Sequence, residues 1–392
     1  LLYLTANENI ISNTAQKFLS SCLGNRYYFD NNKCGFFYSP GFEAVSKQEI
    51  NDLIAVAEDC VNEMLGSKVA SLFALSGLHA MSSVILAVSN PGDIIMTLNA
   101  DYGGHFMTKN LLHRIGRKQI VTSHNKSGEI DILKTCEDFN KKKAKILYLD
   151  SMSMIDRIEV TKLRSKIHDN AIIIFDASHT LGLIMGGQFQ NPFRDGADIV
   201  VGNTHKTFPG PHKAIIAFND KKFGEKIMSI MSSGLYSTTH TNSLISLAIT
   251  VLEIKEYGRE YAKQIIDNSN FLGMLLDGMG YEIRKTVDNR YSHNHQLHIF
   301  LDKEKERGDL ISYFYNNSII INVVMPIKNR RCIRLGLQEV TRRGMKEKDM
   351  HSLAMFFNDS MKNKKIKKFV QKTNKKFSEI HYSFDVINSR EH

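Results

Sequence analysis

Apolar residues recur at helical spacing in residues 47–65, the first long regular segment of the chain. This spacing predicts an amphipathic helix, and Gly66 directly after it is a typical stop signal. Short apolar runs with the character of strands follow further along the chain. They occupy residues 71–75, 93–98, 119–123, 145–150, 171–178, 198–203 and 213–219. We expect each of these runs to form a strand of one sheet.

Helix-like stretches separate several of the expected strands. They lie at residues 76–89, 103–116, 129–142 and 159–169. Strands that alternate with helices indicate crossover connections, which join the parallel strands of a buried sheet. The pattern therefore predicts an α/β fold with a mostly parallel sheet.

The pattern changes near residue 243, where a long helical stretch leads into a second set of elements. We expect strands at 281–286, 295–301, 318–324 and 331–337, with helices at 243–278, near 308–316 and near 346–361. This order is typical of a smaller α+β domain. The 392 residues are long enough for two or three domains. We divide them into an N-terminal segment (1–45), a large domain (46–242) and a linker helix with a small C-terminal domain (243–392).

Composition narrows the class of protein. Hydrophobic residues make up 42% of the chain and charged residues 23%, which is ordinary for a folded soluble protein and excludes global disorder. No run of 18 apolar residues occurs, so we expect no membrane span. Five scattered cysteines without a CxxC pair argue against a zinc ribbon or a disulfide framework. We expect no metal site, and reduced thiols in a cytoplasmic protein.

Most of the net charge of +10 comes from one segment, residues 342–376, which holds twelve Lys or Arg residues and three acidic ones. An excess of basic over acidic residues of this kind can indicate a nucleic-acid partner. No nucleic-acid-binding motif accompanies the segment, however, and no aromatic stacking residues are interleaved through the chain. We therefore expect a solvated basic tail and no nucleic-acid partner, while its role stays open.

Candidate chemistry lies at the ends of two expected strands. Asp176 ends the apolar run 171–178, and His179 follows three residues later. Ligands of open α/β sheets bind outside the carboxyl ends of the strands. Lys206 follows the next run, in a polar loop that ends in Pro209-Gly210-Pro211. Such a Lys can form a Schiff base with an aldehyde.

Pyridoxal 5′-phosphate (PLP) needs a Lys of this kind and an acid that keeps its ring nitrogen protonated. Lys206 and Asp176 could supply the pair, and Ser76-Gly77 could hold the phosphate at the start of the expected helix 76–89. Each residue also has a plain structural interpretation: Asp176 as a helix cap and Lys206 as a solvated side chain. Only the whole set of residues, in this order and at this spacing, favours a PLP site over these structural interpretations.

The order of motifs resembles that of serine hydroxymethyltransferase and its relatives among the fold-type I, aspartate aminotransferase-like PLP enzymes. The similarity runs from residue 4 to about residue 361, and DASHTLGL and THKTFPGP are its most specific parts. The motifs are LTANENIIS (4–12), ALSGLHAM (74–81), ADYGGHFMTK (100–109), DASHTLGL (176–183), THKTFPGP (204–211) and CIRLGLQEVTRRG (332–344). The resemblance implies a seven-stranded, mostly parallel sheet in a large domain and a smaller α+β C-terminal domain.

The resemblance also implies roles for individual residues. Lys206 is then the Schiff-base Lys, Asp176 pairs with the ring nitrogen, and His179 approaches the phenolic oxygen. His105 stacks on the ring, and Arg334 binds the substrate carboxylate. The remaining implied cofactor contacts are Ser76, Gly77, Leu78, Ser151, Asn203, His205 and Thr238, and the remaining implied substrate contacts are Asn7 and Tyr27.

Family likeness further implies a homodimer with shared active sites. Tyr27, in the N-terminal segment, matches a residue that reaches in from the partner subunit. Thr238 and His240 fall where the family places a phosphate loop of the partner, although this chain lacks the Gly-rich sequence there. His205 and Asn203 could instead only shape the Lys206 turn, and His105 could cap a helix.

The chain departs from the family in the half that binds folate. Phe29 stands where the family has a catalytic Glu, with the shorter Asp30 beside it and Glu43 in the same region. The loop before residue 332 is shorter than in the family, Leu78 replaces a phosphate-loop Ser, and His212 replaces an Arg. These departures favour chemistry without folate.

We therefore expect an aldol-type PLP enzyme that forms or cleaves the Cα–Cβ bond of a β-hydroxy amino acid. Its substrates would be an amino acid and an aldehyde, as in threonine aldolases and transaldolases. Two other possibilities stay open: folate-dependent serine/glycine hydroxymethyl transfer, and racemase, decarboxylase or aminotransferase chemistry on the same scaffold.

Overall fold

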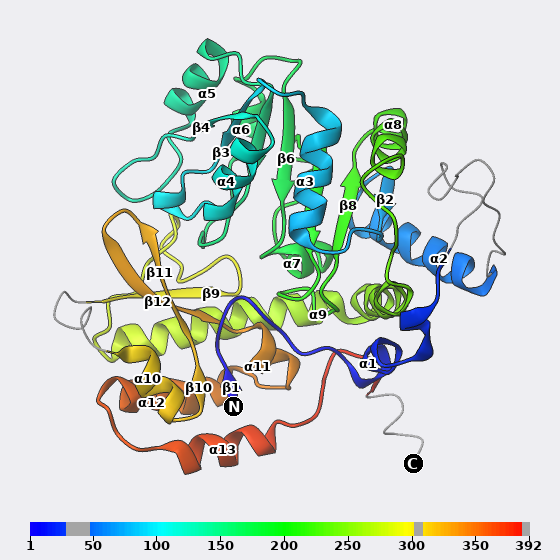
Figure 1. Cartoon of the computed structure of the whole chain (residues 1–392). Helices are drawn as coiled ribbons and strands as arrows, with labels where there is room; N and C mark the ends of the chain where they lie inside the picture. The colour runs from blue at the N-terminus through cyan, green and yellow to red at the C-terminus, as the bar shows by residue number, and fades with distance from the viewer. Residues whose placement is uncertain (29–47, 302–308, 386–392) are drawn as a thin grey trace.

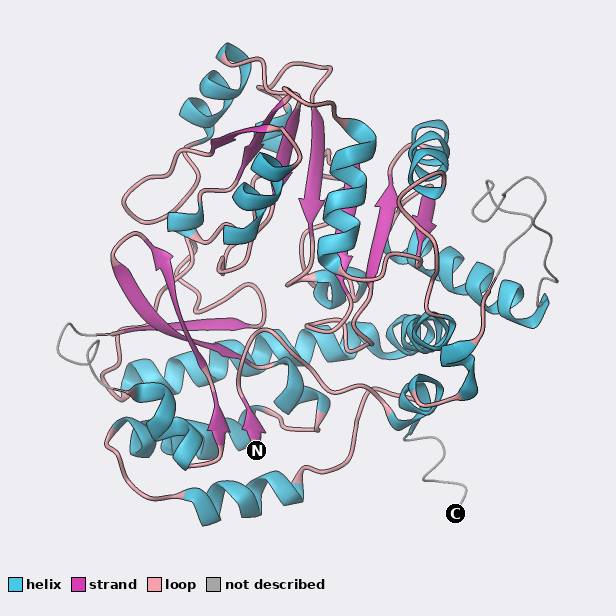
Figure 2. Cartoon of the chain, viewed as in Figure 1, coloured by secondary structure: helices cyan, strands magenta, loops and turns pink. Residues whose placement is uncertain are grey.

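The apolar runs of the first part of the chain meet in one seven-stranded sheet (Figures 1 and 2). The computed structural model describes residues 1–28, 48–301 and 309–385. The spatial order of the strands is β2-β8-β7-β6-β5-β3-β4. They are β2 (Val69–Ser71), β3 (Ile94–Thr97), β4 (Lys118–Val121), β5 (Ile146–Leu149), β6 (Ile172–Asp176), β7 (Ile199–Asn203) and β8 (Ala214–Phe218).

Strands β3 to β7 pair in parallel, whereas β8 runs antiparallel to both of its neighbours. Every residue of β5 and β8 is buried, as the continuous apolar runs require when helices cover both faces of a sheet. The predicted α/β class and the mostly parallel sheet are confirmed. Parallel pairing brings the carboxyl ends of β5, β6 and β7 to one edge.

Helices of the large domain pack on both faces of this sheet (Figure 2). The predicted helix 47–65 is confirmed as α2, and Gly66 ends it with a φ of +75° that favours glycine. The others are α3 (Gly77–Val88), α4 (Phe106–Arg114), α5 (Ile132–Lys141), α6 (Val160–Arg164), α7 (Leu181–Met185) and α8 (Lys221–Ser232), with α2 at Gln48–Leu65 and a short 3₁₀ helix, η2, at Ala100–Tyr102.

One long helix, α9 (Thr241–Gly278), joins the two parts of the molecule. Figure 1 shows it running below the large sheet and on into the small domain. Its N-terminal part, for example Leu244 and Ile254, belongs to the core of the large domain. Leu272 and Leu276 near its end belong to a second core. The helix therefore carries apolar residues for both domains.

The small domain is built on a three-stranded antiparallel sheet of order β11-β12-β9. The N-terminus joins it, because β1 (Leu2–Tyr3) pairs in parallel with β10 (Ile319–Ile320) and Leu2 lies in the second core. From there α1 (Asn13–Leu19) and η1 (Cys22–Asn25) lead back toward α9. The remaining elements are β9 (Gln296–Phe300), α10 (Leu310–Asn316), β11 (Asn322–Ile327), β12 (Arg330–Gly336), α11 (Gln338–Arg342), α12 (Glu347–Met361) and α13 (Lys367–Lys376).

Four predicted elements differ from the structure. The expected strand 71–75 is shifted, because β2 covers Val69–Ser71 and shares only Ser71 with it. The expected strand 281–286 is only a single bridge, from Ile283 to Ile299. The expected strand 318–324 divides into β10 and β11, because the two halves pair with different partners, β1 and β12. The expected helix 159–169 ends at Arg164, whose guanidinium binds the carbonyl oxygen of Gly196 and the carboxylate of Asp198.

The basic tail is not solvated throughout. Arg342 is fully buried and forms a 2.9 Å ion pair with Glu253 of α9, which corrects the expectation of a solvated segment at this position. Most lysines of α13 are exposed, whereas Val370 anchors that helix to the second core. Among the described residues no helix is long and apolar enough to cross a membrane, and no cluster of side chains suits a metal ion.

Candidate active site

A cavity of about 160 Å³ opens at the carboxyl edge of the sheet, where β5, β6 and β7 end. Lys206 and Asp176 both face it, so the two residues that carried the sequence argument lie together. The lining consists of Gly77, Leu78, Met81, His105, Asp150, Ser151, Asp176, Ser178, His179, Asn203 and Lys206.

Lys206 contacts His179 directly, with 3.1 Å between Nζ and Nε2. Burial lowers the pKa of Lys206 to about 8, although the nearby Asp176 carboxylate opposes the shift. Burial and the neighbouring positive charge of Lys206 hold the pKa of His179 well below its usual range. The imidazole is therefore neutral, and it can accept a hydrogen bond from the Lys206 amine.

Asp176 at the end of β6 is held at both carboxylate oxygens. The Tyr148 hydroxyl donates to Oδ2 at 2.9 Å, and the backbone N–H of Ser178 donates to Oδ1 at 2.9 Å. The phenol cannot take the negative charge itself, because burial raises the pKa of Tyr148 well above its usual value. Tyr148 was missed by sequence reasoning, and its only signal was a polar aromatic residue in the otherwise aliphatic strand β5.

The N-terminus of α3 closes the cavity on another side. Gly77 donates its backbone N–H to Asn203 Oδ1 at 2.8 Å, and a Cβ on Gly77 would lie 2.3 Å from that oxygen. The Ser76 hydroxyl accepts a hydrogen bond from the backbone N–H of His79 and so caps the helix. Leu78 is half exposed beside Gly77. The implied cofactor contacts Gly77, Leu78 and Asn203 thus line the cavity, whereas Ser76 does not.

His105 and Ser151 also line the cavity, as the resemblance implied. His105 holds the N-cap position of α4, but its side chain makes no capping hydrogen bond, so the ring is available to the cavity. Asp150, which sequence reasoning missed, accepts hydrogen bonds from the Thr108 hydroxyl at 2.6 Å and the Leu98 N–H at 3.1 Å. Burial raises the pKa of Asp150 well above its usual range.

Arg334 reaches the same region from β12, the middle strand of the small sheet. Its exposed fraction is 2%, and burial lowers the pKa of Arg334 to about 10. Every hydrogen bond that it makes among the described residues goes to a neutral oxygen. The acceptors are Asn322 Oδ1 at 3.1 Å, the Met152 carbonyl at 2.9 Å, Ser153 Oγ at 3.3 Å and Asn7 Oδ1 at 2.6 Å.

A buried polar chain links His179 to the small domain. Gln296 Nε2 lies 3.4 Å from His179 Nδ1, and its Oε1 lies 3.1 Å from His298 Nε2. His295 stacks on His179, with 5.8 Å between ring centroids. Burial lowers the pKa of His298 well below its usual range. The histidine-rich sequence SHNHQLH (292–298) was the available signal for these residues. Its spacing could not show that the segment faces His179.

His205, Thr238 and Tyr27 are implied residues that do not line the cavity of this chain. His205 stacks on His212 with 3.8 Å between ring centroids, outside the lining. Thr238 lies in the loop before α9, and Tyr27 is 64% exposed. Their placement suits residues that shape the Lys206 turn or face a second subunit, and those roles stay predictions. Phe29, Asp30 and Glu43 lie outside the described residues.

Asn9 is a further residue that sequence reasoning missed. Its side-chain amide donates to the Lys206 carbonyl at 2.6 Å and to the Tyr261 hydroxyl at 2.8 Å. The N-terminal segment thus touches the site twice, through Asn7 on Arg334 and Asn9 on Lys206. The expectation that this segment reaches the active site agrees with these contacts.

Comparison with known proteins places these features in a family. The family model described as serine hydroxymethyltransferase matches residues 1–357. The serine hydroxymethyltransferase of Archaeoglobus fulgidus is 30% identical over 399 residues, covering 97% of this chain and 89% of that protein. The enzyme of Methanocella arvoryzae is 31% identical over 399 residues, covering 98% of this chain and 92% of that protein.

Two transaldolases are also similar to the chain. The fluorothreonine transaldolase of Streptantibioticus cattleyicolor is 33% identical over 362 residues, which are 90% of this chain. The chain spans only 56% of the length of that relative. The crystal structure of L-threonine transaldolase from Pseudomonas fluorescens in its internal aldimine state matches with a TM-score of 0.89 and 28% identity, covering 98% of this chain and 90% of that one.

Proposed function

Because the chain belongs to the serine hydroxymethyltransferase family, we propose that it breaks and forms the Cα–Cβ bond of a β-hydroxy amino acid without folate. The fold is that of the fold-type I PLP enzymes, and an aldol-type PLP activity on this scaffold agrees with the two similar transaldolases. The folate-independent reaction and its substrates are the proposed part. One observation carries the amino-acid substrate: Arg334 is buried with only neutral partners among the described residues.

PLP is the cofactor of this enzyme family, and the side chains of the cavity fit it. Lys206 offers an amine for the aldehyde, Asp176 a carboxylate for the ring nitrogen, and His105 an imidazole for the ring face. The start of α3 offers a helix N-terminus for the phosphate, and a Cβ at Gly77 would collide with the Asn203 side chain. When bound, the protonated ring withdraws electrons from the carbon that carries the substrate amino group.

Arg334 is proposed to bind the substrate carboxylate. A buried guanidinium is costly without an anion, and a carboxylate can accept two parallel hydrogen bonds from its fork. Asn7 and Asn322 hold the guanidinium at two nitrogens and fix its plane. Fixing the carboxylate fixes the orientation of the bonds at the α-carbon, so Arg334 helps to select which bond breaks.

His179 and Lys206 are proposed to handle protons. Breaking the Cα–Cβ bond of a β-hydroxy amino acid requires that the hydroxyl proton leaves as the aldehyde forms. The buried, neutral His179 and the Lys206 amine lie side by side, and either nitrogen can accept that proton in its unprotonated form. Asp176, held in place by hydrogen bonds from the Tyr148 hydroxyl and the Ser178 N–H, is proposed to support the charge of a protonated ring nitrogen.

Folate-dependent serine/glycine hydroxymethyl transfer is the second candidate. It is favoured by the many relatives of that name, such as the two that are 30% and 31% identical to the chain. It is disfavoured by Phe29, which replaces the family's catalytic Glu and cannot transfer a proton.

One assay separates the two candidates. The purified holoenzyme is given a β-hydroxy amino acid such as threonine together with benzaldehyde, and acetaldehyde release and the new β-hydroxy amino acid are measured. In parallel, glycine formation from serine is followed against tetrahydrofolate concentration. We expect aldehyde release without folate and no saturable folate dependence. A saturable, folate-dependent rate from serine with no aldehyde exchange would establish the second candidate instead.

We also propose that two copies of the chain assemble with shared active sites. The support is that Tyr27 is exposed and Thr238 lies away from the cavity of its own chain. Sedimentation velocity of the holoenzyme should show a dimer or a larger assembly. An active monomer at assay concentrations would overturn this proposal and the cross-subunit roles of both residues.

A further inference from the structure

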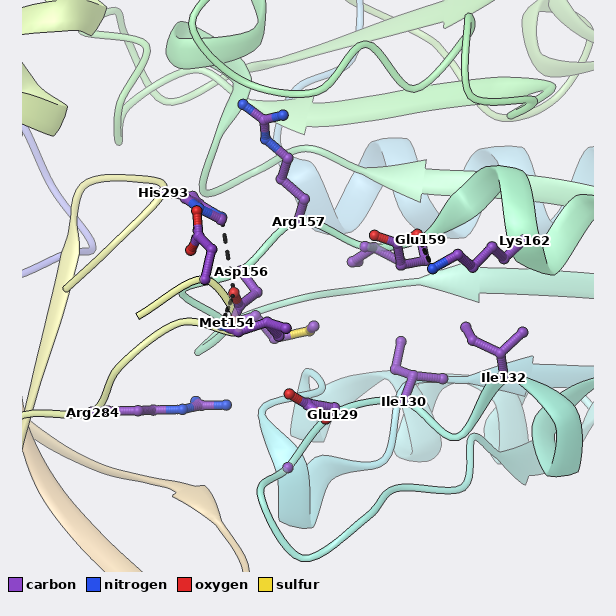
Figure 3. A pocket seen from close by; sticks show the side chains of 14 residues that line it. Glu129, Ile130, Ile132, Met154, Asp156, Arg157, Glu159, Lys162, Arg284 and His293 are labelled. Atoms are coloured by element: carbon purple, nitrogen blue, oxygen red, sulfur yellow. Dashed lines mark hydrogen bonds and ion pairs between the residues drawn. The ribbon is translucent and has the colours of Figure 1, made fainter. Parts of the chain in front are cut away.

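A second, larger cavity of about 560 Å³ lies between the large and small domains (Figure 3). None of its lining residues belongs to the lining of the Lys206 cavity. The large domain contributes residues 128–132 and 154–162, and the small domain contributes residues 284–293. The lining consists of Gly128, Glu129, Ile130, Ile132, Met154, Asp156, Arg157, Ile158, Glu159, Lys162, Arg284, Val287, Asp288 and His293.

Arg284 is the central charge of this pocket. Its exposed fraction is 8%, and Figure 3 shows its side chain extending from the small domain toward Met154 and Glu129. Its single side-chain hydrogen bond among the described residues is a long one, 3.4 Å from Nη1 to the Ser153 carbonyl. No described carboxylate forms an ion pair with it. The carboxylates of Asp156 and Glu129 lie near enough to oppose the lowering of the Arg284 pKa by burial, but no carboxylate accepts a hydrogen bond from this guanidinium among the described residues.

Most other charges of the lining have partners, and Arg157, which makes no hydrogen bond or ion pair among the described residues, is exposed to solvent. Lys162 pairs with Glu159 at 2.9 Å at the open end, and His293 Nε2 pairs with Asp288 at 3.0 Å. Glu129 accepts a hydrogen bond from Asn125, outside the lining, at 2.6 Å. Asp156 accepts one from the backbone N–H of Val287 at 3.1 Å, while burial raises the pKa of Asp156. Arg284 therefore stands out as the buried cation with unused donors.

The lining mixes ionisable side chains with a group of apolar ones. Ile130, Ile132, Met154 and Ile158 form one side of the pocket, and the last two are themselves buried. Ligand sites of this volume are typically concave and apolar with one or two polar groups that fix the orientation of the ligand. The pocket thus joins an apolar wall to one unpaired guanidinium.

We propose that this pocket binds a small organic carboxylate, with its carboxylate on Arg284 and its apolar body against Ile130, Met154 and Ile158. A monoanion fits better than a phosphate ester, because the nearby Asp156 and Glu129 repel a second negative charge. The two domains each supply a wall, so the bound molecule would hold them together.

The site is also linked to the active site through Ser153. Its carbonyl oxygen accepts the hydrogen bond from Arg284, and its hydroxyl accepts one from Arg334 at 3.3 Å. A ligand that draws the Arg284 guanidinium away from Ser153 would change the surroundings of Arg334. Occupancy of the pocket is therefore expected to alter the affinity for an amino-acid substrate.

The test uses 4-ethylbenzoate, which has no amine or aldehyde that could react with the cofactor. Its binding to the holoenzyme is measured by isothermal titration calorimetry, with neutral 4-ethylbenzamide as the control ligand. We expect 4-ethylbenzoate to bind and the benzamide to bind at least tenfold more weakly, because it lacks the charge-assisted hydrogen bonds. We expect Arg284→Gln to weaken 4-ethylbenzoate binding roughly tenfold or more.

Two controls separate this pocket from the active site. Arg334→Gln and saturating glycine should each leave 4-ethylbenzoate bound, because neither blocks the second pocket. Ile130→Trp, which fills the pocket without touching the guanidinium, should abolish binding and covers the case in which Arg284→Gln does not fold. Unchanged affinity in Arg284→Gln, binding that survives Ile130→Trp, complete displacement of 4-ethylbenzoate by glycine, or no binding up to millimolar ligand would overturn the proposal.

Discussion

The Nζ atom of Lys206 lies 3.1 Å from Nε2 of His179, although the two residues are 27 positions apart in the chain. They meet because His179 follows β6, Lys206 follows β7, and these strands are parallel neighbours. His179 is buried and Lys206 is half-buried at the cavity, and burial lowers the pKa of both groups. The neutral imidazole of His179 can therefore accept a hydrogen bond from the Lys206 amine.

We expect Lys206→Ala to abolish covalent attachment of PLP. The purified variant should lose the yellow absorbance that borohydride can trap on the wild-type chain, and aldehyde release should fall by roughly 10²–10⁴-fold or more, since a positioned proton-transfer group is lost as well. Lys222→Ala, at an exposed lysine of α8, is the matched control and should behave as wild type. A borohydride-reducible bond to PLP in Lys206→Ala would contradict the assignment.

The lowered pKa of Lys206 predicts a pH dependence for cofactor loading. Only the neutral amine attacks the cofactor aldehyde, so the loading rate of the apoenzyme should rise with pH and level off above a pKa of about 8. Stopped-flow absorbance at a series of pH values measures this rate. A midpoint near the ordinary lysine value of about 10.4 would show that Lys206 is not buried as described.

We expect Arg334→Lys to weaken substrate binding while PLP stays bound. Lysine keeps the charge but cannot reproduce the planar fork, and loss of a charged hydrogen bond of about 1.5–3 kcal/mol weakens binding roughly tenfold to hundredfold. Spectral titration with glycine measures the affinity. Arg330→Lys is the matched control, because Arg330 lies on the same strand but is exposed. Unchanged glycine affinity in Arg334→Lys would remove Arg334 from the proposed carboxylate site.

Gly77→Ala should weaken PLP binding through a steric clash. The new Cβ would lie 2.3 Å from Asn203 Oδ1, so the hydrogen bond that this oxygen accepts from the Gly77 N–H must break. We expect a loss of about 1–3 kcal/mol, measured as the PLP dissociation constant and the melting temperature. Gly278→Ala meets nothing within 4 Å and should leave both values close to wild type. Asn203→Ala added to Gly77→Ala should relieve the clash and restore part of the stability.

Several parts of the site could be read from the sequence because their signals are local. Asp176 and Lys206 stand at the ends of apolar runs, and the parallel pairing of those runs follows from the alternation of strands and helices. Gly77 could be placed at a helix start by the same local reasoning. The family motifs added His105 and Ser151, and the structure places both at the cavity.

Other parts depended on contacts between distant segments. Asn7 and Arg334 are 327 residues apart, and they meet because β1 joins the small domain and brings the N-terminus beside β12. Gln296 reaches His179 across the domain boundary, from the edge strand β9 of the small sheet. No periodicity in the sequence encodes either approach.

By itself, the sequence determined the alternating strands and helices, the mostly parallel sheet, and the order of the residues around the cofactor, because these follow from local apolar patterns and short motifs. The tertiary structure alone decided that Tyr148 binds Asp176, that Arg334 is buried among neutral oxygens, and that Arg284 faces a pocket between the domains. The physical reason is that burial and unpaired charge arise when segments far apart in the chain pack together. The sequence shows which residues are present. Only the packing of the chain decides which side chains are removed from water and which hydrogen-bond or ion-pair partners they then have.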